Sequence, residues 1–276
     1  PTDLDILVTG ETGTGKELVA RALHETSTRA SGPFVALNCA ALPESLFEIE
    51  IFGHVAGAFP GAQDKPGKLE AASGGTLMLD EVEAMPAAIQ PKLLRALQER
   101  AVERLGENRL RPLDLRIVAT SKTDLRPLTL DGSFRADLFY RLAGAEVAVE
   151  PLRSLGEDII LIFSHYAGLA AARYGREVPE LDYPLKQRLL RRSWPGNVRE
   201  LKAAAERFAL VLDIPEGSAA PLAAPESLAD RVAAFEAREI RLALEHCRGN
   251  IERAAKALGM ARRTLNDKIS RYGIRI

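Results

Sequence analysis

The chain has 276 residues, of which 46% are hydrophobic and 27% charged, and its formal net charge is −1. This length and composition exclude a disordered or fibrous chain and suit one large and one small globular domain. The apolar run at residues 159–163 is too short to span a membrane, no basic secretory signal is recognisable, and Cys39 and Cys247 form neither a metal-binding nor a disulfide pattern. We therefore expect a cytoplasmic protein that has no membrane partner.

Strands and helices alternate in the first half of the chain. Short apolar runs predict buried strands, and leucines and alanines at helical spacing predict helices between them. The expected strands are residues 4–9, 34–37, 76–79, 115–120 and 147–149, and the expected helices are residues 17–28 and 88–100, the latter with Pro86 and Pro91 near its first turn. Such alternation predicts a parallel sheet that helices cover on both faces.

The pattern changes after Pro151, where no further strand is expected. Helices are predicted at residues 157–173, 183–192 and 198–212, and they form a helical lobe. Residues 213–227 hold three prolines and show no periodicity, which is typical of a linker. The expected organisation is an α/β subdomain at residues 1–150, a helical lid at 151–212, the linker, and a small all-α module at 228–276.

A glycine-rich segment lies between the first predicted strand and the first predicted helix. It contains the residues Gly10, Glu11, Thr12, Gly13, Thr14, Gly15 and Lys16. In this position the glycines let backbone N–H groups surround a phosphate, and the lysine neutralises the β- and γ-oxygens. The segment therefore predicts an ATP-binding loop. Glu17 follows Lys16 where a Ser or Thr usually ligates Mg²⁺, so the metal must rely on other groups and on water.

Two acidic residues end the predicted strand at residues 76–79. The carboxyl ends of parallel strands meet at one edge of the sheet, so Asp80 and Glu81 should lie beside the phosphate loop. There Asp80 can hold Mg²⁺ through water, and Glu81 can orient the attacking water. The alternative, a solvated acidic strand end, remains open on these residues alone. The pair favours an ATPase.

Several motifs together resemble one family. The sequence around the loop, G-E-T-G-T-G-K-E, is similar to the AAA+ domain of the NtrC-type activators of sigma-54 RNA polymerase. The same holds, in the same order, for L-N-C-A-A-L at residues 37–42, F-G-H-V-A-G-A-F at 52–59, F-R-A-D-L at 134–138 and W-P-G-N-V-R-E-L at 194–201. Details such as L-D-E-V at 79–82 are similar to the dicarboxylate-transport regulator branch.

The resemblance implies roles for further polar residues. Asn38 would restrain Glu81 until ATP is engaged, and Thr120 and Ser121 would occupy the sensor I position. Arg135 and Arg141 would be arginine fingers that reach the γ-phosphate bound by a neighbouring subunit, and Arg199 would be the sensor II residue of the lid. An arginine supplied in trans stabilises charge that develops on the γ-phosphoryl group. Surface salt bridges are the alternative for each arginine taken alone.

A short loop carries an aromatic residue between small ones. It consists of Gly57, Ala58, Phe59, Pro60, Gly61 and Ala62. Phe is usually buried, yet flexible neighbours suit a projecting apolar contact. The family has G-A-F-T-G-A here and engages sigma-54 through the Phe. Pro60 replaces the Thr, removing its hydroxyl and an N–H, which puts the strength of this contact in doubt.

The C-terminal module is basic. Residues 228–276 carry a net charge of +5, and residues 248–276 a net charge of +6. Ala254, Ala255 and Leu258 give one apolar face, Gly259 suits a turn, and a basic segment follows, which together predict a helix-turn-helix of the kind found in Fis-type domains. The residues expected to contact double-stranded DNA at an enhancer are Arg262, Arg263, Thr264, Asn266, Lys268 and Arg271. A helical hairpin that only oligomerises is the alternative.

We therefore expect a P-loop AAA+ ATPase with a helical lid and a Fis-type domain. It would use ATP and Mg²⁺ to remodel sigma-54 polymerase as a ring of six or seven subunits, with dimers formed through a helix bearing Val232, Phe235, Ile240 and Leu244. A DNA-bound regulator that acts without sigma-54 is the first alternative, because of Pro60. A repressor whose loop only senses nucleotide is the second, and Glu81 argues against it. We also expect a piece of a longer protein, because family members have further AAA+ residues before the loop and usually a receiver domain.

Overall fold

The computed structural model describes residues 2–212 and 214, and then residues 233, 236, 237, 239–241, 243, 244, 247 and 250–272. The chain divides into two compact units between residues 218 and 219.

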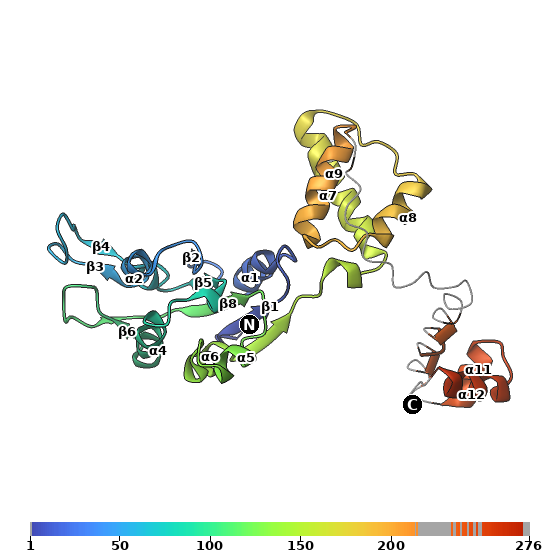
Figure 1. Cartoon of the computed structure of the whole chain (residues 1–276), viewed down its shortest axis with the longest axis horizontal. Coiled ribbons are helices and arrows are strands. Elements are labelled where there is room, and N and C mark those ends of the chain that lie inside the picture. Colours follow the sequence, from blue (N-terminus) through green and yellow to red (C-terminus); the bar gives the residue numbers. More distant parts are fainter. Residues whose placement is uncertain are drawn as a thin grey trace. The chain divides into compact units, whose positions relative to one another are not determined.

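A parallel sheet forms the centre of the first unit (Figure 1). Within residues 2–212, its five strands run in the order β2-β5-β8-β1-β9, with Ile6 of β1 paired to Val118 of β8 and to Ala145 of β9. The sheet confirms the expected parallel α/β architecture. The strands are β1 Ile6–Thr9, β2 Phe34–Asn38, β5 Thr76–Asp80, β8 Arg116–Ser121 and β9 Ala145–Ala148.

Alternate strand residues face opposite sides of this sheet, as the pleat requires. Val8 and Met78 pack with Ala20 of helix α1 on one side. Leu7 and Leu77 belong to a larger apolar cluster on the other side. The helices are α1 Lys16–Glu25 on the first side and α2 Glu44–Phe52, α3 Lys68–Ala71, α4 Ile89–Glu99, α5 Arg126–Leu130 and α6 Ala136–Leu142 with the larger cluster.

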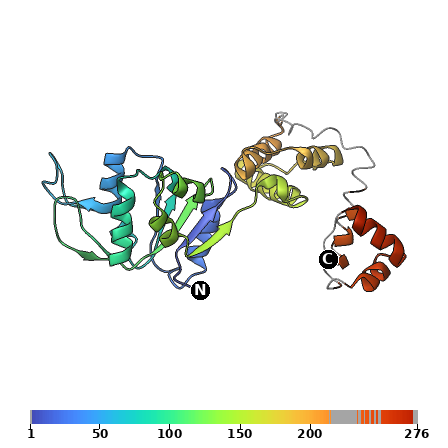
Figure 2. The same cartoon turned by 60° about the horizontal axis from the view of Figure 1, so that its bottom comes forward.

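Two short hairpins extend side by side from one end of the α/β part (Figures 1 and 2). One consists of β3 Gly53–His54 and β4 Lys65–Pro66, and the other of β6 Ala101–Val102 and β7 Arg111–Pro112. Backbone hydrogen bonds join them, because Val55 donates to the carbonyl of Leu105 (3.1 Å) and Leu105 donates to Gly53 (3.0 Å). The loop at residues 57–62 therefore has a firm base.

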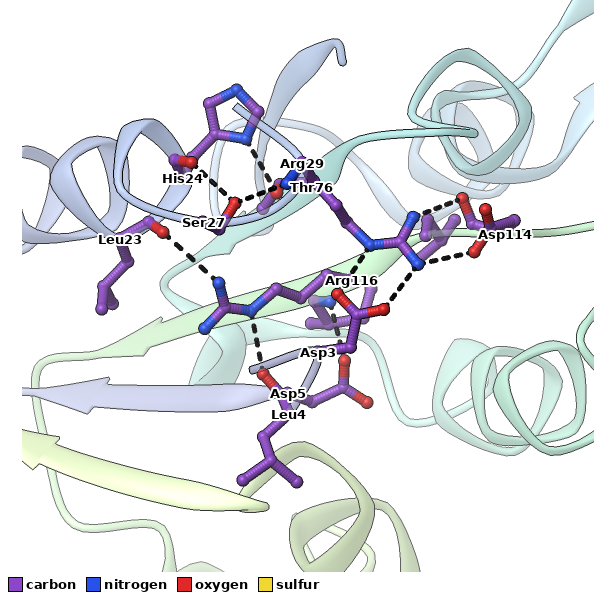
Figure 3. Close-up of polar contacts among 12 residues, drawn as sticks. Asp3, Leu4, Asp5, Leu23, His24, Ser27, Arg29, Thr76, Asp114 and Arg116 are labelled. Carbon is purple, nitrogen blue, oxygen red and sulfur yellow. Dashed lines mark hydrogen bonds and ion pairs between the residues drawn. The ribbon is translucent and has the colours of Figure 1, made fainter. Parts of the chain in front are cut away.

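A charged network closes the edge of the sheet at which β1 begins (Figure 3). Arg29 donates to both carboxylate oxygens of Asp3 (3.0 Å each) and to Asp114 (2.6 Å). Arg116 donates to the carbonyls of Leu4 (2.9 Å) and Leu23 (3.3 Å). These contacts tie the segment before β1 to the rest of the α/β part, while the opposite edge carries the phosphate loop.

Within residues 151–212, three α-helices form the lid, confirming the helical lobe. They are α7 Asp158–Tyr174, α8 Tyr183–Arg191 and α9 Asn197–Ala209, and α7 packs along α9. The core of the lid holds Phe163, Trp194 and Leu201, all at most 1% exposed. The Trp194 indole N–H donates to the carbonyl of Leu189 at 2.9 Å, so this large ring is buried with its polar atom satisfied.

The second unit contains a helix-turn-helix. Helix α11 (Ile251–Ala257) is capped by Asn250, whose side chain accepts from the N–H groups of Glu252 and Arg253. Helix α12 (Arg262–Arg271) follows a turn in which Gly259 has φ of 65°. Leu265 and Ile269 of α12 pack with Ala254, Ala255, Ile240 and Leu244. Of the expected linker only Ile214 is described, and Val232 and Phe235 lie outside the described residues.

Some predicted boundaries were wrong. The first strand begins at Ile6 rather than Leu4, whose side chain is 52% exposed. Helix α1 begins at Lys16 and ends at Glu25, because the backbone turns at Thr26 and Ser27. Helices α2, α3, α5 and α6 and both hairpins were not predicted, because their sequences carry no long periodic pattern.

Candidate functional site

The glycine-rich segment forms a loop between β1 and α1. Thr14 donates through its hydroxyl to the carbonyl of Glu11 (2.9 Å), and the Lys16 ammonium donates to the carbonyls of Gly10 (2.7 Å) and Glu11 (3.0 Å). Gly15 ends the loop at the N-terminus of α1 with φ of 98°. The loop thus curls around the Lys16 amine, at a helix N-terminus whose positive potential favours a phosphate.

Lys16 is largely buried, and its charge faces several others. Burial lowers the pKa of the Lys16 ammonium; the negative charges of Asp80, Glu83 and Glu81 act in the opposite direction. The Lys16 cation therefore lies within electrostatic range of three carboxylates. A phosphate bound at this point would add negative charge and favour the protonated lysine further.

Asp80 and Thr120 meet at the carboxyl ends of β5 and β8. The Thr120 hydroxyl donates to Oδ1 of Asp80, and the backbone N–H of Glu81 lies 3.3 Å from the same hydroxyl oxygen. Ser121 differs, since its hydroxyl donates to the carbonyl of Thr123 instead of Asp80. Its contact with the phosphate loop is made by its backbone carbonyl, which accepts from the N–H of Gly10. Of the two expected sensor I residues, Thr120 alone reaches the acidic pair through its side chain.

Asn38 lies next to Asp80 rather than Glu81. Its amide donates to Oδ2 of Asp80 at 3.0 Å. The expected Asn38 contact with Glu81 is therefore not the one found here, because β2 pairs with β5 in a register that sets Asn38 opposite Asp80. Asn38 orients Asp80 in this arrangement.

Glu81 occupies an unusual backbone position. Its φ is 55°, in the left-handed region that few non-glycine residues adopt. Its carboxylate is 31% exposed and lies 3.7 Å from the ammonium of Lys122, which is equally distant from Glu83. Lys122 and Glu83 were not among the predicted site residues, although both lie within two residues of one in the sequence. Strained backbone at such a position is common at functional sites.

The fit to Mg²⁺ depends on oxygen donors. Asp80 supplies a carboxylate at the sheet edge beside Lys16, which suits an ion that keeps several waters. Glu17 does not contribute, because its exposed carboxylate pairs with Arg21 on the next turn of α1 (2.8 Å). In the described residues no cluster of three or more His, Cys, Asp or Glu forms a closed metal site. The residues thus fit a magnesium ion that is carried mainly by a nucleotide and water.

A surface hollow of about 460 Å³ adjoins the loop. It opens onto Gly10 and Glu11 and is also lined by Thr123, Val149 and Pro151. Its volume is within the range of small-ligand sites. The hollow therefore offers space beside the phosphate loop for a part of a ligand that is larger than a phosphate group.

The two predicted arginine fingers have different surroundings. Arg135 is 49% exposed and forms a double hydrogen bond with Asp137 (3.0 and 2.7 Å), while its backbone N–H is fixed by buried Gln90. Arg141 pairs instead with the buried carboxylate of Asp5 at 2.7 Å. Asp5 lies at the start of β1, opposite the phosphate loop. Arg141 therefore has a buried partner, whereas Asp137, the partner of Arg135, is exposed.

The loop at residues 57–62 is closed by its own backbone. Gly57 donates to the carbonyl of Ala62 (3.3 Å) and Ala62 donates to Phe59 (3.0 Å). Phe59 is 39% exposed, and its ring packs on His54. Gly106 of the neighbouring hairpin approaches so closely that a Cβ there would lie 2.8 Å from Ala58. An exposed aromatic residue is thus presented on a braced loop.

Helix α12 exposes most of the residues predicted to bind DNA. Arg262, Arg263, Thr264, Asn266 and Arg271 are exposed. The Lys268 side chain is only 25% exposed, and its ammonium pairs with Glu236, which also accepts from the Tyr272 hydroxyl at 2.6 Å. Lys268 is therefore partly committed within its own unit. The helices that the structure describes include none long and apolar enough to cross a membrane.

Three family descriptions match successive parts of the chain. Residues 1–148 match the sigma-54 interaction domain, residues 153–231 the AAA+ ATPase lid domain, and residues 231–272 the Fis family of bacterial regulatory proteins. The matches follow the order of the α/β part, the lid and the helix-turn-helix.

Curated relatives share the same regions. The C4-dicarboxylate transport transcriptional regulatory protein DctD of Pseudomonas aeruginosa is 54% identical over 98% of this chain and 59% of its own length. The regulatory protein AtoC of Escherichia coli is 43% identical over 98% of this chain and 62% of its own. The probable regulatory protein HrpR of Pseudomonas syringae is 42% identical over 99% of this chain and 87% of its own. The chain spans about three fifths of the length of the DctD relatives.

Solved structures support the same fold. NtrX from Brucella abortus in complex with ADP superposes with a TM-score of 0.73 at 35% identity, covering 99% of this chain and 66% of that one. The complex of the same protein with ATP gives a TM-score of 0.71 at 34% identity, covering 99% and 65%.

Proposed function

The chain belongs to the sigma-54 interaction-domain family of AAA+ transcription regulators, and from this premise we propose that it hydrolyses ATP to activate transcription by sigma-54 RNA polymerase. The observation that carries the proposal is the meeting of Asp80, Glu81 and Thr120 at the sheet edge beside Lys16. A protein that only binds nucleotide has no need of a water-orienting acid at this point.

The proposed hydrolysis depends on how the protein positions the phosphates and the attacking water. Lys16 and the loop N–H groups bind the β- and γ-phosphates, and Glu81 orients the attacking water in line with the γ-phosphoryl group. Asp80, held by Asn38 and Thr120, would carry Mg²⁺ through water, and the ion would neutralise charge on the phosphate oxygens. Arg199 of the lid would contact the γ-phosphate. Each role is the one that the family resemblance implies, and the contacts of Lys16, Asp80 and Thr120 at the sheet edge support the proposal.

Remodelling of the polymerase is proposed to use the loop at residues 57–62. Phe59 supplies the apolar contact with sigma-54, and the two hairpins connect it to the ATPase core. Pro60 is compatible with this role, because the backbone hydrogen bonds of the loop come from the N–H groups of residues 57, 58 and 62 rather than residue 60. The loss of an N–H at Pro60 therefore leaves the closed loop intact.

DNA binding is proposed for the second unit, through the exposed face of α12 on double-stranded enhancer DNA. The organisation follows the same bounds as before, with the ATPase at residues 1–150, the lid at 151–212, the linker at 213–227 and the DNA-binding domain at 228–276. Oligomerisation is part of the proposal, since Arg135 would complete a neighbour's site in a ring. A cytoplasmic location accords with a DNA-bound regulator.

A regulator that acts independently of sigma-54 is the second candidate, because Pro60 removes the hydroxyl of the family's loop. Transcription in vitro from a sigma-54 promoter, with purified polymerase, ATP and this protein, separates the two. We expect transcripts that require sigma-54 and hydrolysable ATP. Activation with the major sigma factor alone, or none with sigma-54, would favour the second candidate.

A further inference from the structure

The carboxylate of Glu11, within the phosphate loop, is directed toward the lid. It accepts two hydrogen bonds from the guanidinium of Arg153 (2.8 and 2.5 Å) and one from the amide of Asn197 (3.2 Å). Arg153 lies in the turn before α7, and Asn197 is the first residue of α9. One side chain of the loop thus holds two separate segments of the lid.

Asn197 is fully buried, and both the nitrogen and the oxygen of its amide have hydrogen-bond partners. Besides Glu11, its N–H₂ group donates to the carbonyl of Thr12 (3.0 Å), and its oxygen accepts from the backbone of Leu152 (2.8 Å). Its φ is 49°, a conformation that is costly for most residues and better tolerated by Asn. A buried polar group with this many bonds is hard to replace, because each lost partner leaves an unpaired group.

The pair of Arg153 and Glu11 carries full charges at ordinary pH. Hydrogen bonding from Arg153, followed by that from Asn197, lowers the pKa of Glu11 to about 2. The carboxylate is therefore ionised well below neutral pH, and Arg153 offsets a negative charge that would otherwise lie within a phosphate-binding loop. The double hydrogen bond also fixes the orientation of the guanidinium relative to the carboxylate, which a single contact from a lysine would not do.

These contacts bring the start of α9 against the loop. A Cβ on Gly13 would lie 2.3 Å from the carbonyl oxygen of Gly196, and Gly13 has φ of 81°, so only glycine fits at this position. The backbone N–H of Arg199 donates to the carbonyl of Gly13 at 3.2 Å, and the positive charge of Arg199 acts on Lys16. The base of the Arg199 side chain is therefore held directly beside the phosphate loop.

We propose that Glu11, Asn197 and Arg153 form a lid latch, a set of positioning residues that holds Arg199 where it can distinguish ATP from ADP. The proposal rests on the proposed nucleotide site. None of the three latch residues needs to touch the γ-phosphate. Their effect is transmitted through the placement of Arg199, so a broken latch weakens ATP binding more than ADP binding.

The test compares nucleotide affinities of the 276-residue protein carrying Arg153→Gln, Glu11→Gln or both. ATPγS and ADP are titrated in competition with a fluorescent nucleotide. We expect the Kd for ATPγS to rise roughly tenfold in each single variant, within the usual range of coupling between sites, while the Kd for ADP changes much less. The double variant should be no weaker than the weaker single one, because both substitutions break one contact.

Arg199→Ala provides the decisive background. If the latch acts through Arg199, adding Arg153→Gln to Arg199→Ala changes neither Kd further. A further loss in that background, equal weakening of ATPγS and ADP, or unchanged affinities in the single variants would each overturn the latch.

Two controls separate the latch from stability and from the nucleotide site itself. Arg29→Gln removes a similar double hydrogen bond, to Asp3 at the opposite edge of the sheet, and should lower thermal stability without altering either Kd (Figure 3). Lys16→Ala should abolish binding of both nucleotides. If Lys16→Ala still binds nucleotide, the proposed nucleotide site is wrong. If Lys16→Ala loses binding while the latch variants keep normal affinity, the nucleotide site stands and only the latch proposal is wrong.

Discussion

The ring of Phe59 packs edge-on against the imidazole of His54, with ring centres 4.9 Å apart and planes at 83°. His54 is buried, and among the described residues its Nδ1 atom has no hydrogen-bond partner. The aromatic residue of the loop therefore lies on a buried aromatic ring while 39% of its surface is exposed. Such an arrangement keeps a side chain available for a partner without leaving it free in solvent.

Phe59→Ala should separate activation from the other activities. The substitution removes the proposed sigma-54 contact but no residue of the phosphate loop or of α12, so DNA binding and most ATP turnover should survive while transcription is lost. A gel-shift titration, an ATPase assay and transcription from a sigma-54 promoter measure the three. Full activation by this variant would rule out the projecting-loop role and favour the sigma-54-independent candidate.

Glu81→Gln should retain ATP binding and lose turnover. The change removes the negative charge that orients water but preserves the size of the side chain, so we expect turnover to fall by ~10²-fold or more, the scale of positioned acid–base groups. Nucleotide titration and steady-state ATPase measurements check the two halves. Glu83→Gln, two residues away, is the matched control and should affect turnover less. Near-normal turnover in Glu81→Gln would contradict its assignment.

Features that depend on a few consecutive residues could be predicted from the sequence. Buried strands such as the one predicted at residues 76–79, and the acids Asp80 and Glu81 that follow, were recognisable because a parallel strand is a continuous apolar run. The phosphate loop was equally clear from its glycines. In each case the chemistry lies within a few consecutive residues.

Contacts between distant segments could not be predicted in the same way. Asn197 is 186 positions from Glu11, and their hydrogen bond depends on how the lid packs against the phosphate loop. Asn38 lies on Asp80 because of strand register, which the sequence does not specify. The pairing of Arg141 with Asp5 is similarly remote, 136 positions apart, and it separates two arginines that the motif alone treats alike.

Arg135→Ala should impair hydrolysis without disturbing the fold. Its side chain is half-exposed, and among the described residues its guanidinium pairs only with Asp137 on the adjoining helix, so the thermal midpoint should change little. If Arg135 acts in trans, ATP should still bind, and mixing with Glu81→Gln subunits should restore part of the activity, because some interfaces then combine an intact Arg135 with an intact Glu81. Turnover per subunit that is independent of concentration, with no rescue on mixing, would contradict a shared site.

Arg141→Ala should behave differently, because it leaves the buried carboxylate of Asp5 with the backbone N–H of Ile117 as its remaining described donor. We expect a loss of unfolding free energy on the order of 1–3 kcal/mol, the cost of an unpaired buried polar group. Denaturant titration of Arg141→Ala beside Arg135→Ala measures the difference. Equal stability of the two variants would show that the Asp5 pair contributes little, and any loss of turnover in Arg141→Ala would then be a direct effect on hydrolysis.

Arg263→Ala and Lys268→Ala should differ in DNA binding, although both remove one positive charge from α12. Arg263 is exposed, whereas Lys268 is held by Glu236 within the same unit. If Arg263 contacts a base, its loss should weaken site binding by ~1–3 kcal/mol and relax specificity at that position. If it contacts only phosphate, binding should fall about equally on all sequences, and the slope of log affinity against log salt should drop by about one unit.

Lys268→Ala should change this salt slope by much less than one unit, because the lysine charge is already offset by Glu236. Gel-shift titrations at several salt concentrations, on specific and random DNA, compare the two variants. ATP turnover should be normal in both, since the proposed ATPase residues all lie in the first unit. A salt slope reduced equally by both substitutions would mean that Lys268 leaves Glu236 to meet the DNA backbone, and that the whole basic face of α12 acts as one surface.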